Sequence, residues 1–148
     1  MAGSGRYLGR PARHWNELLS SPDPLARRLA CHALGQCGAL GEDVVATLRA
    51  TAADDPEGYV RVWAAASLAR HDPGDGTARS ALLRECGDPA DFVRSLAVWM
   101  LGRLDLPTAD GEVDAVVRRL LDDSAPSVRA EAAIACDRLA ADSSRQNR

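Results

Sequence analysis

The chain has 148 residues, of which 46% are hydrophobic and 26% are charged, the composition of a single globular domain. Its formal net charge of −3 argues against attraction of the whole chain to nucleic acid or to an anionic membrane. No apolar run approaches the roughly 18 residues of a membrane span, and no hydrophobic stretch follows the basic N-terminus as in a secretory signal, so we expect a cytoplasmic protein.

The predicted elements begin after a segment rich in glycine and arginine, residues 1–12, which we expect to be flexible. The next residues, HWNELL from His14 to Leu19, predict a short helix. Trp15 stands three and four residues before Leu18 and Leu19, so its indole is expected to pack on them and cover the end of the domain.

Four later segments align without gaps and define an internal repeat. They are ARRLACHALG (26–35), VRVWAAASLA (60–69), VRSLAVWMLG (93–102) and VRAEAAIACD (128–137). Their arginines, Arg27, Arg61, Arg94 and Arg129, are separated by 34, 33 and 35 residues.

Each of these segments follows a turn that contains Asp, Ser or Pro, and each turn follows another segment that favours helix. The turns are SSPDP, DDPEG, GDPAD and DDSAP, and the preceding segments are HWNELL, EDVVATLRATA, TARSALLREC and EVDAVVRRLL. The unit is therefore helix, turn, helix. We place the units at residues 13–38, 41–71, 76–104 and 109–140, separated by breaks such as DPGDG and DLPTADG, and expect a flexible tail at 141–148.

The unit resembles the HEAT-like repeat, in particular its short bacterial form named from phycobilisome lyases. In that form a turn Asp is followed by Val-Arg, small residues and Leu-Gly. The resemblance covers roughly residues 13–140, with Ala26 in the first unit and Cys136-Asp137 in the last as departures. The matching residues are Asp55, Val60, Arg61, Ala64 and Leu68; Asp88, Val93, Arg94, Ala97, Leu101 and Gly102; and Asp123, Val128, Arg129 and Ala132.

This resemblance implies an all-α fold, a right-handed α-solenoid of about four antiparallel helix pairs. The first helix of each pair would lie outside, and the second helices would line the concave surface. The resemblance also implies that the repeat arginines form ion pairs with turn aspartates such as Asp55, Asp88 and Asp123, which is a structural role.

Helical geometry predicts which residues face the concave surface, because each residue advances the helix by about 100°. Counted from the repeat arginine as position 0, the apolar or small residues at −1, +3, +4 and +7 mark the packed side. Positions +1, +2, +5 and +9 then fall on the concave side. Position +1 holds Arg28, Val62, Ser95 and Ala130, and position +2 holds Leu29, Trp63, Leu96 and Glu131. Position +5 holds His32, Ala66, Trp99 and Ile134, and position +9 holds Gln36, Arg70, Arg103 and Arg138.

Two indoles on this surface, Trp63 and Trp99, make a binding site our leading interpretation, because Trp and Arg are enriched among the residues that dominate interfaces. The alternatives are that the indoles only fill the groove or are buried in a homo-oligomer. The arginines at +9 would select an acidic partner, or else are solvated or paired with loop carboxylates. The predicted binding residues are Trp63, Trp99, Leu29, His32, Leu96, Arg70, Arg103 and Arg138.

No catalytic constellation is present in the sequence: there is no phosphate-binding glycine loop, no nucleophile elbow and no H-E-x-x-H motif. Four cysteines, Cys31, Cys37, Cys86 and Cys136, lack zinc-like spacing and are predicted to be reduced core thiols. We therefore expect no metal and no cofactor.

A non-enzymatic scaffold or adaptor that binds a peptide or helix is thus the leading hypothesis, with its partner and oligomeric state left open. HEAT-like DNA glycosylases, which use groove tryptophans with a catalytic aspartate and a basic face, are a rival. A phycobilin-lyase-like chaperone is another. The net charge and the scarcity of inner-face aspartates argue against the first, and no bilin-handling residue marks the second.

Overall fold

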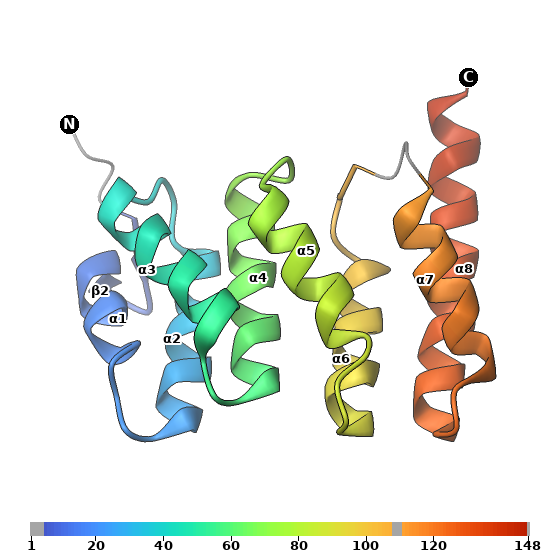
Figure 1. The fold of residues 1–148 in the computed structure, drawn as a ribbon. Helices are drawn as coiled ribbons and strands as arrows, with labels where there is room; N and C mark the ends of the chain where they lie inside the picture. The colour runs from blue at the N-terminus through green and yellow to red at the C-terminus, as the bar shows by residue number, and fades with distance from the viewer. Residues whose placement is uncertain (1–4, 108–110, 148) are drawn as a thin grey trace.

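A computed structural model describes residues 5–107 and 111–147, which form a short hairpin and eight α-helices stacked in pairs (Figure 1). The strands are β1 (Arg6–Tyr7) and β2 (Arg10–Pro11). The helix pairs are α1 (Ala12–Leu18) with α2 (Pro24–Gln36), α3 (Glu42–Asp54) with α4 (Gly58–His71), α5 (Gly76–Glu85) with α6 (Asp91–Leu101), and α7 (Glu112–Arg119) with α8 (Pro126–Gln146). A 3-10 turn, η1 (Leu120–Asp122), extends α7.

The helices form two layers (Figure 1). The second helices pack in the order α2, α4, α6 and α8, and the first helices α1, α3 and α5 pack beside one another on the same side of that row. Each pair thus contacts the next pair along the stack. This arrangement confirms the predicted α-solenoid.

The turns between paired helices depend on an aspartate at the same place in three units. Asp55, Asp88 and Asp123 each accept a hydrogen bond from the backbone N–H two residues later, at 2.8 to 3.0 Å. Such a bond fixes the turn ahead of the helix. In the first unit Asp23 instead caps α2 by accepting from the N–H of Leu25 at 2.9 Å.

The core lies between the two layers, where the repeat pattern placed it. The alanine at position +3 is 0% exposed in all four units, and the leucine at +7 is at most 2% exposed in the three units that have one. Trp15 is 6% exposed, so its predicted place in the core is confirmed. All four cysteines are free, and only Cys136 is not buried.

Residues 5–12, the described part of the segment that was expected to be flexible, include a hairpin that packs on the first helix pair. β1 and β2 pair antiparallel through a turn at Leu8 and Gly9, both of which have positive φ. Tyr7 then packs its ring 6.1 Å from that of Trp15. The hairpin folds because this contact covers the exposed end of the first helix pair; residues 1–4 lie outside the described chain.

α8 continues to Gln146 and so includes residues 141–146 of the segment that was expected to be a flexible tail. No glycine or proline interrupts the sequence after Pro126, so nothing breaks the helix. Residue 148 lies outside the described chain, as do residues 109–110 of the predicted fourth unit.

Candidate functional site

The repeat arginines connect successive units. Arg27 donates from Nε and Nη2 to the two carboxylate oxygens of Asp55 at 2.8 and 3.0 Å, and Arg94 makes the same bidentate pair with Asp123 at 2.9 Å. The third nitrogen, Nη1, donates to a carbonyl of the arginine's own turn, Ser21 or Asp88. These pairs confirm, for Arg27 and Arg94, the ion bridges that the resemblance implied, and all three nitrogens of each guanidinium group have a partner.

Arg61 differs from this expectation in its main partner. It pairs with Glu85 of α5 at 2.7 and 2.8 Å and with Asp88 at 3.2 Å. Glu85 is 2% exposed. Burial raises the pKa of this carboxyl, but hydrogen bonds from Arg61 and Arg84 outweigh it, so the pKa is lowered overall.

The side of the second helices that faces away from the repeat arginines carries most of the apolar residues predicted to bind a partner. We call this surface the second-helix face and define it by Leu29, Trp63, Leu96, Trp99 and Ile134. Leu29 and Ile134 are 41% and 47% exposed, and the other three are half-buried. Neither indole is sealed from solvent by its own chain.

Two positions assigned to this face are wrong, because Val62 and Ala66 of α4 are 0% exposed. The reason is that α4 is flanked on both sides, by α2 and by α6. Small side chains at +1 and +5 therefore stay between the helices, and only the longer Trp63 reaches the surface.

Trp63 belongs to an aromatic cluster at the N-terminal end of the face. The His32 ring lies edge-on to it at 5.3 Å, and Tyr7 packs on His32 at 5.8 Å. The pKa of His32 is lowered by burial and by the charges of Arg70 and Arg28. The His32 ring thus contacts the rings of both Tyr7 and Trp63.

Trp99, on α6, lies beside a cleft of about 260 Å³. The guanidinium carbon of Arg103 lies 4.4 Å from the centre of its ring, which is cation–π geometry. Arg70 and Pro73 line the same cleft from α4 and the segment after it. On its other side Trp99 borders a depression that Ile134 and Arg138 line.

The cations of this face differ from Arg27, Arg61 and Arg94, because they have no acidic partner among the described residues. Within the described chain, no ion pair or side-chain hydrogen bond joins Arg28, Arg70, Arg103 or Arg138 to a carboxylate. Arg28 stacks on Trp63 with its guanidinium carbon 5.4 Å from the ring centre. Sequence reasoning placed Arg28 on this side but did not select it or Tyr7; position +1, shared with buried Val62, was the only signal for Arg28.

Comparison with known proteins identifies the repeat. A sequence profile described as HEAT repeats matches residues 15–69 and again residues 53–137. The chain belongs to the HEAT repeat family. No curated protein matches the sequence. HEAT repeats generally mediate interactions between proteins.

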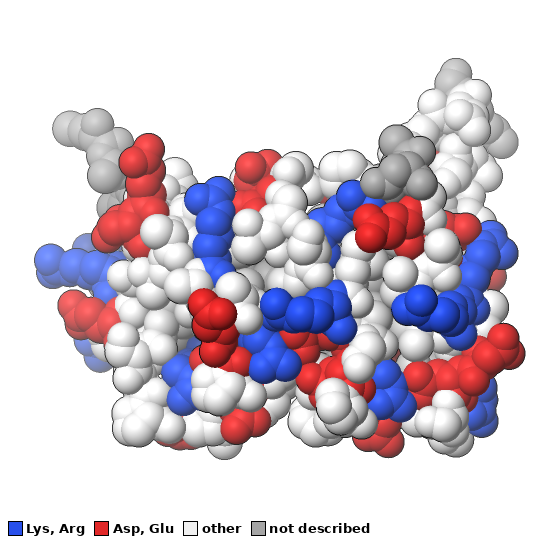
Figure 2. Space-filling model, viewed as in Figure 1, with Lys and Arg blue, Asp and Glu red and all other residues white. Residues whose placement is uncertain are grey.

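The first-helix side of the HEAT stack has a different surface. Figure 2 shows arginines and carboxylates interspersed over it, without a region of one sign. Several are paired, as Arg49 is with Asp75 at 2.9 Å and Arg118 with Asp114 at 2.7 Å. Among the described helices of the HEAT stack, none has the length and apolar character needed to cross a bilayer.

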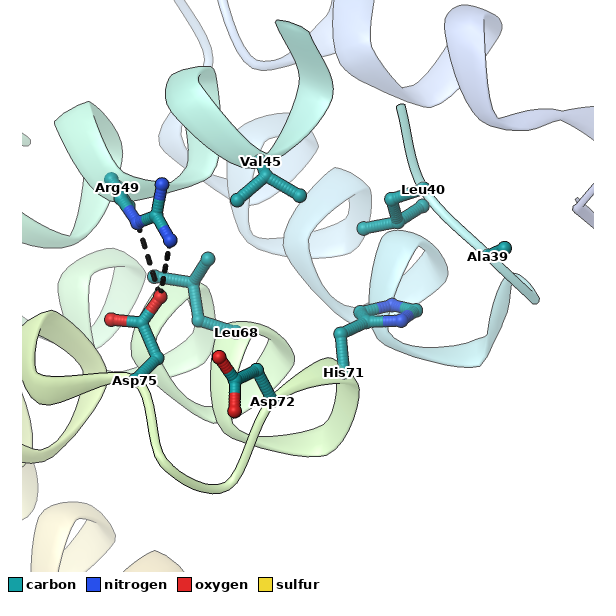
Figure 3. Close-up of a pocket in the computed structure, with 8 residues that line it drawn as sticks. All are labelled: Ala39, Leu40, Val45, Arg49, Leu68, His71, Asp72 and Asp75. Atoms are coloured by element: carbon teal, nitrogen blue, oxygen red, sulfur yellow. Dashed lines mark hydrogen bonds and ion pairs between the residues drawn. The ribbon is translucent and has the colours of Figure 1, made fainter. Parts of the chain in front are cut away.

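A second cleft, of about 350 Å³, opens between the start of α3 and the end of α4 (Figure 3). It contains His71, Asp72 and Asp75, and each of these side chains makes at least one hydrogen bond within the stack. His71 Nε2 bonds the carbonyl of Leu34 at 2.9 Å, and Asp72 accepts from the N–H of Gly74 at 3.0 Å.

Asp75 is the third polar residue of this cleft. It caps α5 by accepting from the N–H groups of Thr77 and Ala78, and it also accepts from Arg49. Burial raises the pKa of Asp75, but these bonds outweigh it and lower the pKa. In the cleft of Figure 3, Asp75 therefore has a structural role, joining Arg49 of α3 to the start of α5.

Proposed function

We propose that the chain is a non-enzymatic interaction module that binds an acidic peptide or helix on its second-helix face. The observation that carries the proposal is the combination of half-buried indoles with guanidinium groups that have no acidic partner. By contrast, the repeat arginines Arg27, Arg61 and Arg94 are each paired with a carboxylate.

The apolar part of the face would supply most of the binding energy. An indole contributes a large apolar area at a low cost in side-chain entropy, and truncation of such a residue at an interface commonly costs about 2 kcal/mol or more. Trp63 and Trp99 stand on neighbouring second helices, α4 and α6. A peptide or an amphipathic helix lying across these helices would contact both.

The charged part of the face would select the sign of the partner. Glu131 is the one acidic residue at positions +1, +2, +5 and +9, against four arginines. A cation already stacked on an indole keeps its N–H edges available, so a carboxylate can bind at the rim while an apolar side chain contacts the ring. Complementary charge of this kind mainly sets specificity and the rate of association.

A peptide-display selection tests the proposal without a known partner. A library of random twelve-residue peptides is panned on the immobilised protein, and we expect enriched sequences to combine Asp or Glu with large apolar residues. Trp99→Ala and Arg103→Gln should each weaken binding of the enriched peptides by about tenfold or more. Enrichment of basic peptides, or binding unchanged in both variants, would contradict the proposal.

Leu121→Ala is the control. Leu121 is a large apolar residue that is 38% exposed, but it belongs to η1 and not to a second helix. Its removal should leave peptide binding unchanged. Equal losses in Leu121→Ala and Trp99→Ala would show that any exposed apolar side chain has the same effect.

The rival nucleic-acid function is an outcome of the same set of measurements. Tryptophans beside arginines also suit stacked bases, and such binding falls steeply with salt because phosphate contacts release counterions. A gel shift with single-stranded and duplex DNA at low salt should show no retention. Retention abolished by Arg70→Gln with Arg103→Gln would favour that rival over a peptide.

The proposal extends to the compartment. All four cysteines are free, and Cys31 and Cys86 are buried with pKa values raised to about 12 by that burial. Inert thiols of this kind suit a reducing compartment, which supports a cytoplasmic location.

A further inference from the structure

In α2, α4 and α6, one stripe of the helix surface forms the contact with the next unit. It consists of positions 0, +4 and +8, counted from the repeat arginine. At +4, Cys31, Ala65 and Val98 are all 0% exposed. At +8, a Cβ added to Gly35 would lie 2.8 Å from Ser67 Oγ of α4, and one added to Gly102 would lie 3.0 Å from Ala135 Cβ of α8.

The same stripe on α8 is uncovered. Arg129, Ala133 and Asp137 occupy positions 0, +4 and +8, and all three are exposed. Within the described chain no element packs on this stripe, since α8 contacts α6, α7 and η1. We call Arg129, Ala133 and Asp137 the end stripe.

Arg129 is preorganised for a carboxylate that none of the described residues supplies. Its Nη1 donates to the carbonyls of Asp123 and Ser124 at 2.7 and 3.0 Å, as the other repeat arginines do with their own turns. In Arg27 and Arg94, Nε and Nη2 hold the bidentate aspartate. For Arg129, no carboxylate among the described residues takes this place.

Asp137 argues against a further stacked unit of the interior kind. Position +8 is Gly35, Ala69 or Gly102 in the other units, where a neighbouring helix approaches closely. Stacking another unit there would bury the Asp137 carboxylate without a partner, which is strongly unfavourable. The stripe needs an occupant that brings a cation to Asp137 and an anion to Arg129.

The opposite end of the stack does not meet that need. In the first unit, the position of the bridging aspartate is Ser21, six residues before Arg27. The hairpin β1–β2 and Tyr7 also pack over this end. A head-to-tail contact between two copies would therefore offer Arg129 a hydroxyl in place of a carboxylate.

We propose that the end stripe joins two copies of this chain, with their α8 helices packed antiparallel about a two-fold axis at Ala133. Arg129 and Asp137 stand four residues on either side of Ala133, about 6 Å along the helix. An antiparallel two-fold contact then brings Arg129 of each copy to Asp137 of the second copy, so each pair is made twice.

The surface around the axis fits this packing. The alanine at the centre allows close approach along the i±4 row, which is the row used in the commonest class of helix packing. Ala130 is exposed beside it and enlarges the apolar centre. The two ion pairs flank that centre and fix the antiparallel orientation.

A charge-swap experiment tests the contact. Sedimentation equilibrium of the full chain from about 10 to about 500 μM covers the range expected of a small interface. The wild-type protein should show a reversible monomer–dimer equilibrium. Arg129→Glu and Asp137→Arg should each weaken dimerisation about tenfold or more, because each places like charges opposite one another, and the double variant should restore it to within about threefold.

Two further variants separate the contact from general effects. Ala133→Arg places a long side chain on the axis at an exposed position, so it should abolish the dimer while leaving the circular dichroism unchanged. Arg145→Glu reverses an 82% exposed charge on the same helix, twelve residues beyond Ala133, and should leave dimerisation unchanged. A wild-type monomer throughout the range, a dimer insensitive to Ala133→Arg, or a double variant as weak as the single ones would overturn the proposal.

Discussion

Arg27 and Arg28 are neighbours in the sequence, yet the fold puts them in opposite roles. Arg27 is held by both oxygens of Asp55 and by the carbonyl of Ser21, and its side chain is 11% exposed. Arg28 lies over the face of Trp63 and has no carboxylate partner within the described chain. The same difference separates Arg61 and Arg94 from Arg70 and Arg103.

The difference teaches where charge stabilises this molecule and where it is available for a partner. A bidentate pair that is removed from water leaves a costly buried charge when one member is lost, whereas a cation at a solvent boundary contributes little to folding. Repeat arginines should therefore control the free energy of unfolding, and arginines of the second-helix face should control binding. The following substitutions test that division.

The largest effect is expected for Arg61→Ala. It removes the main partner of Glu85, which is 2% exposed, although Arg84 still donates to the same carboxylate at 2.9 Å. We expect a loss of about 3 kcal/mol in the free energy of unfolding, measured by urea denaturation. Arg70→Ala, in the same helix, is the control and should change it by less than about 0.5 kcal/mol. Similar losses in the two variants would break the division.

A smaller difference is expected between two arginines at the same repeat position. Arg94→Gln removes the bidentate pair with Asp123 and should cost about 2 kcal/mol, whereas Arg129→Gln removes only bonds to two carbonyls and should cost about 0.5 kcal/mol. Because the end stripe is proposed to dimerise, both variants are denatured at low concentration. Equal costs would mean that the carboxylate partner contributes nothing.

Acid should weaken the bridged part of the molecule. Hydrogen bonds from Arg94 lower the pKa of Asp123 from its ordinary value of 3.8, and the pKa of Glu85 is lowered from 4.5. Below those values the unfolded chain binds more protons, so stability present at neutral pH is lost as the pH falls through the lowered values. The melting temperature should change only slightly from pH 7 to about pH 5 and decline much more steeply below about pH 4. A decline of the same size in Asp123→Asn would show that this bridge is not responsible.

The repeat itself could be predicted from the sequence because the same physical requirement recurs four times. Alanines at +3 and leucines at +7 must pack between layers, and an arginine must reach the next turn, so periodicity reveals both. Glu85 could not be found this way, because it lies in α5 and replaces Asp88 as the main partner in one unit only. A substitution of partner leaves no periodic signal.

The binding face was predictable in direction but not residue by residue. Helical phase placed Trp63, Leu96 and Trp99 correctly toward solvent. It wrongly placed Val62 and Ala66 at the surface. The helical phase takes one helix at a time, so it contains no information that α4 packs between α2 and α6. Composition suggested a flexible N-terminal segment. It could not reveal the aromatic contacts that dock this segment, because they join Tyr7 to Trp15 and His32.

A weaker pH effect should come from His32, on the boundary between the two regions. Its pKa is lowered from 6.5, first by burial and then by Arg70 and Arg28. Below pH 6.5 the unfolded chain therefore binds more protons, and stability falls as the pH drops through the lowered pKa. Thermal melts between pH 7.5 and pH 5 should show a small slope that disappears in His32→Gln. A slope that persists unchanged in this variant would assign it to another group.

The smallest effect on folding is expected where the effect on binding is greatest. Arg70→Gln combined with Arg103→Gln removes two cations of the second-helix face and keeps most of their length, so the free energy of unfolding should change by less than about 0.5 kcal/mol. Binding of acidic peptides from the display selection should fall about tenfold or more, and the dependence of that binding on salt should diminish. Melting curves and fluorescence titrations on the same samples measure both quantities. A loss of stability comparable with that of Arg94→Gln would mean that these arginines belong with the repeat arginines, and the indoles beside them would then have a packing role.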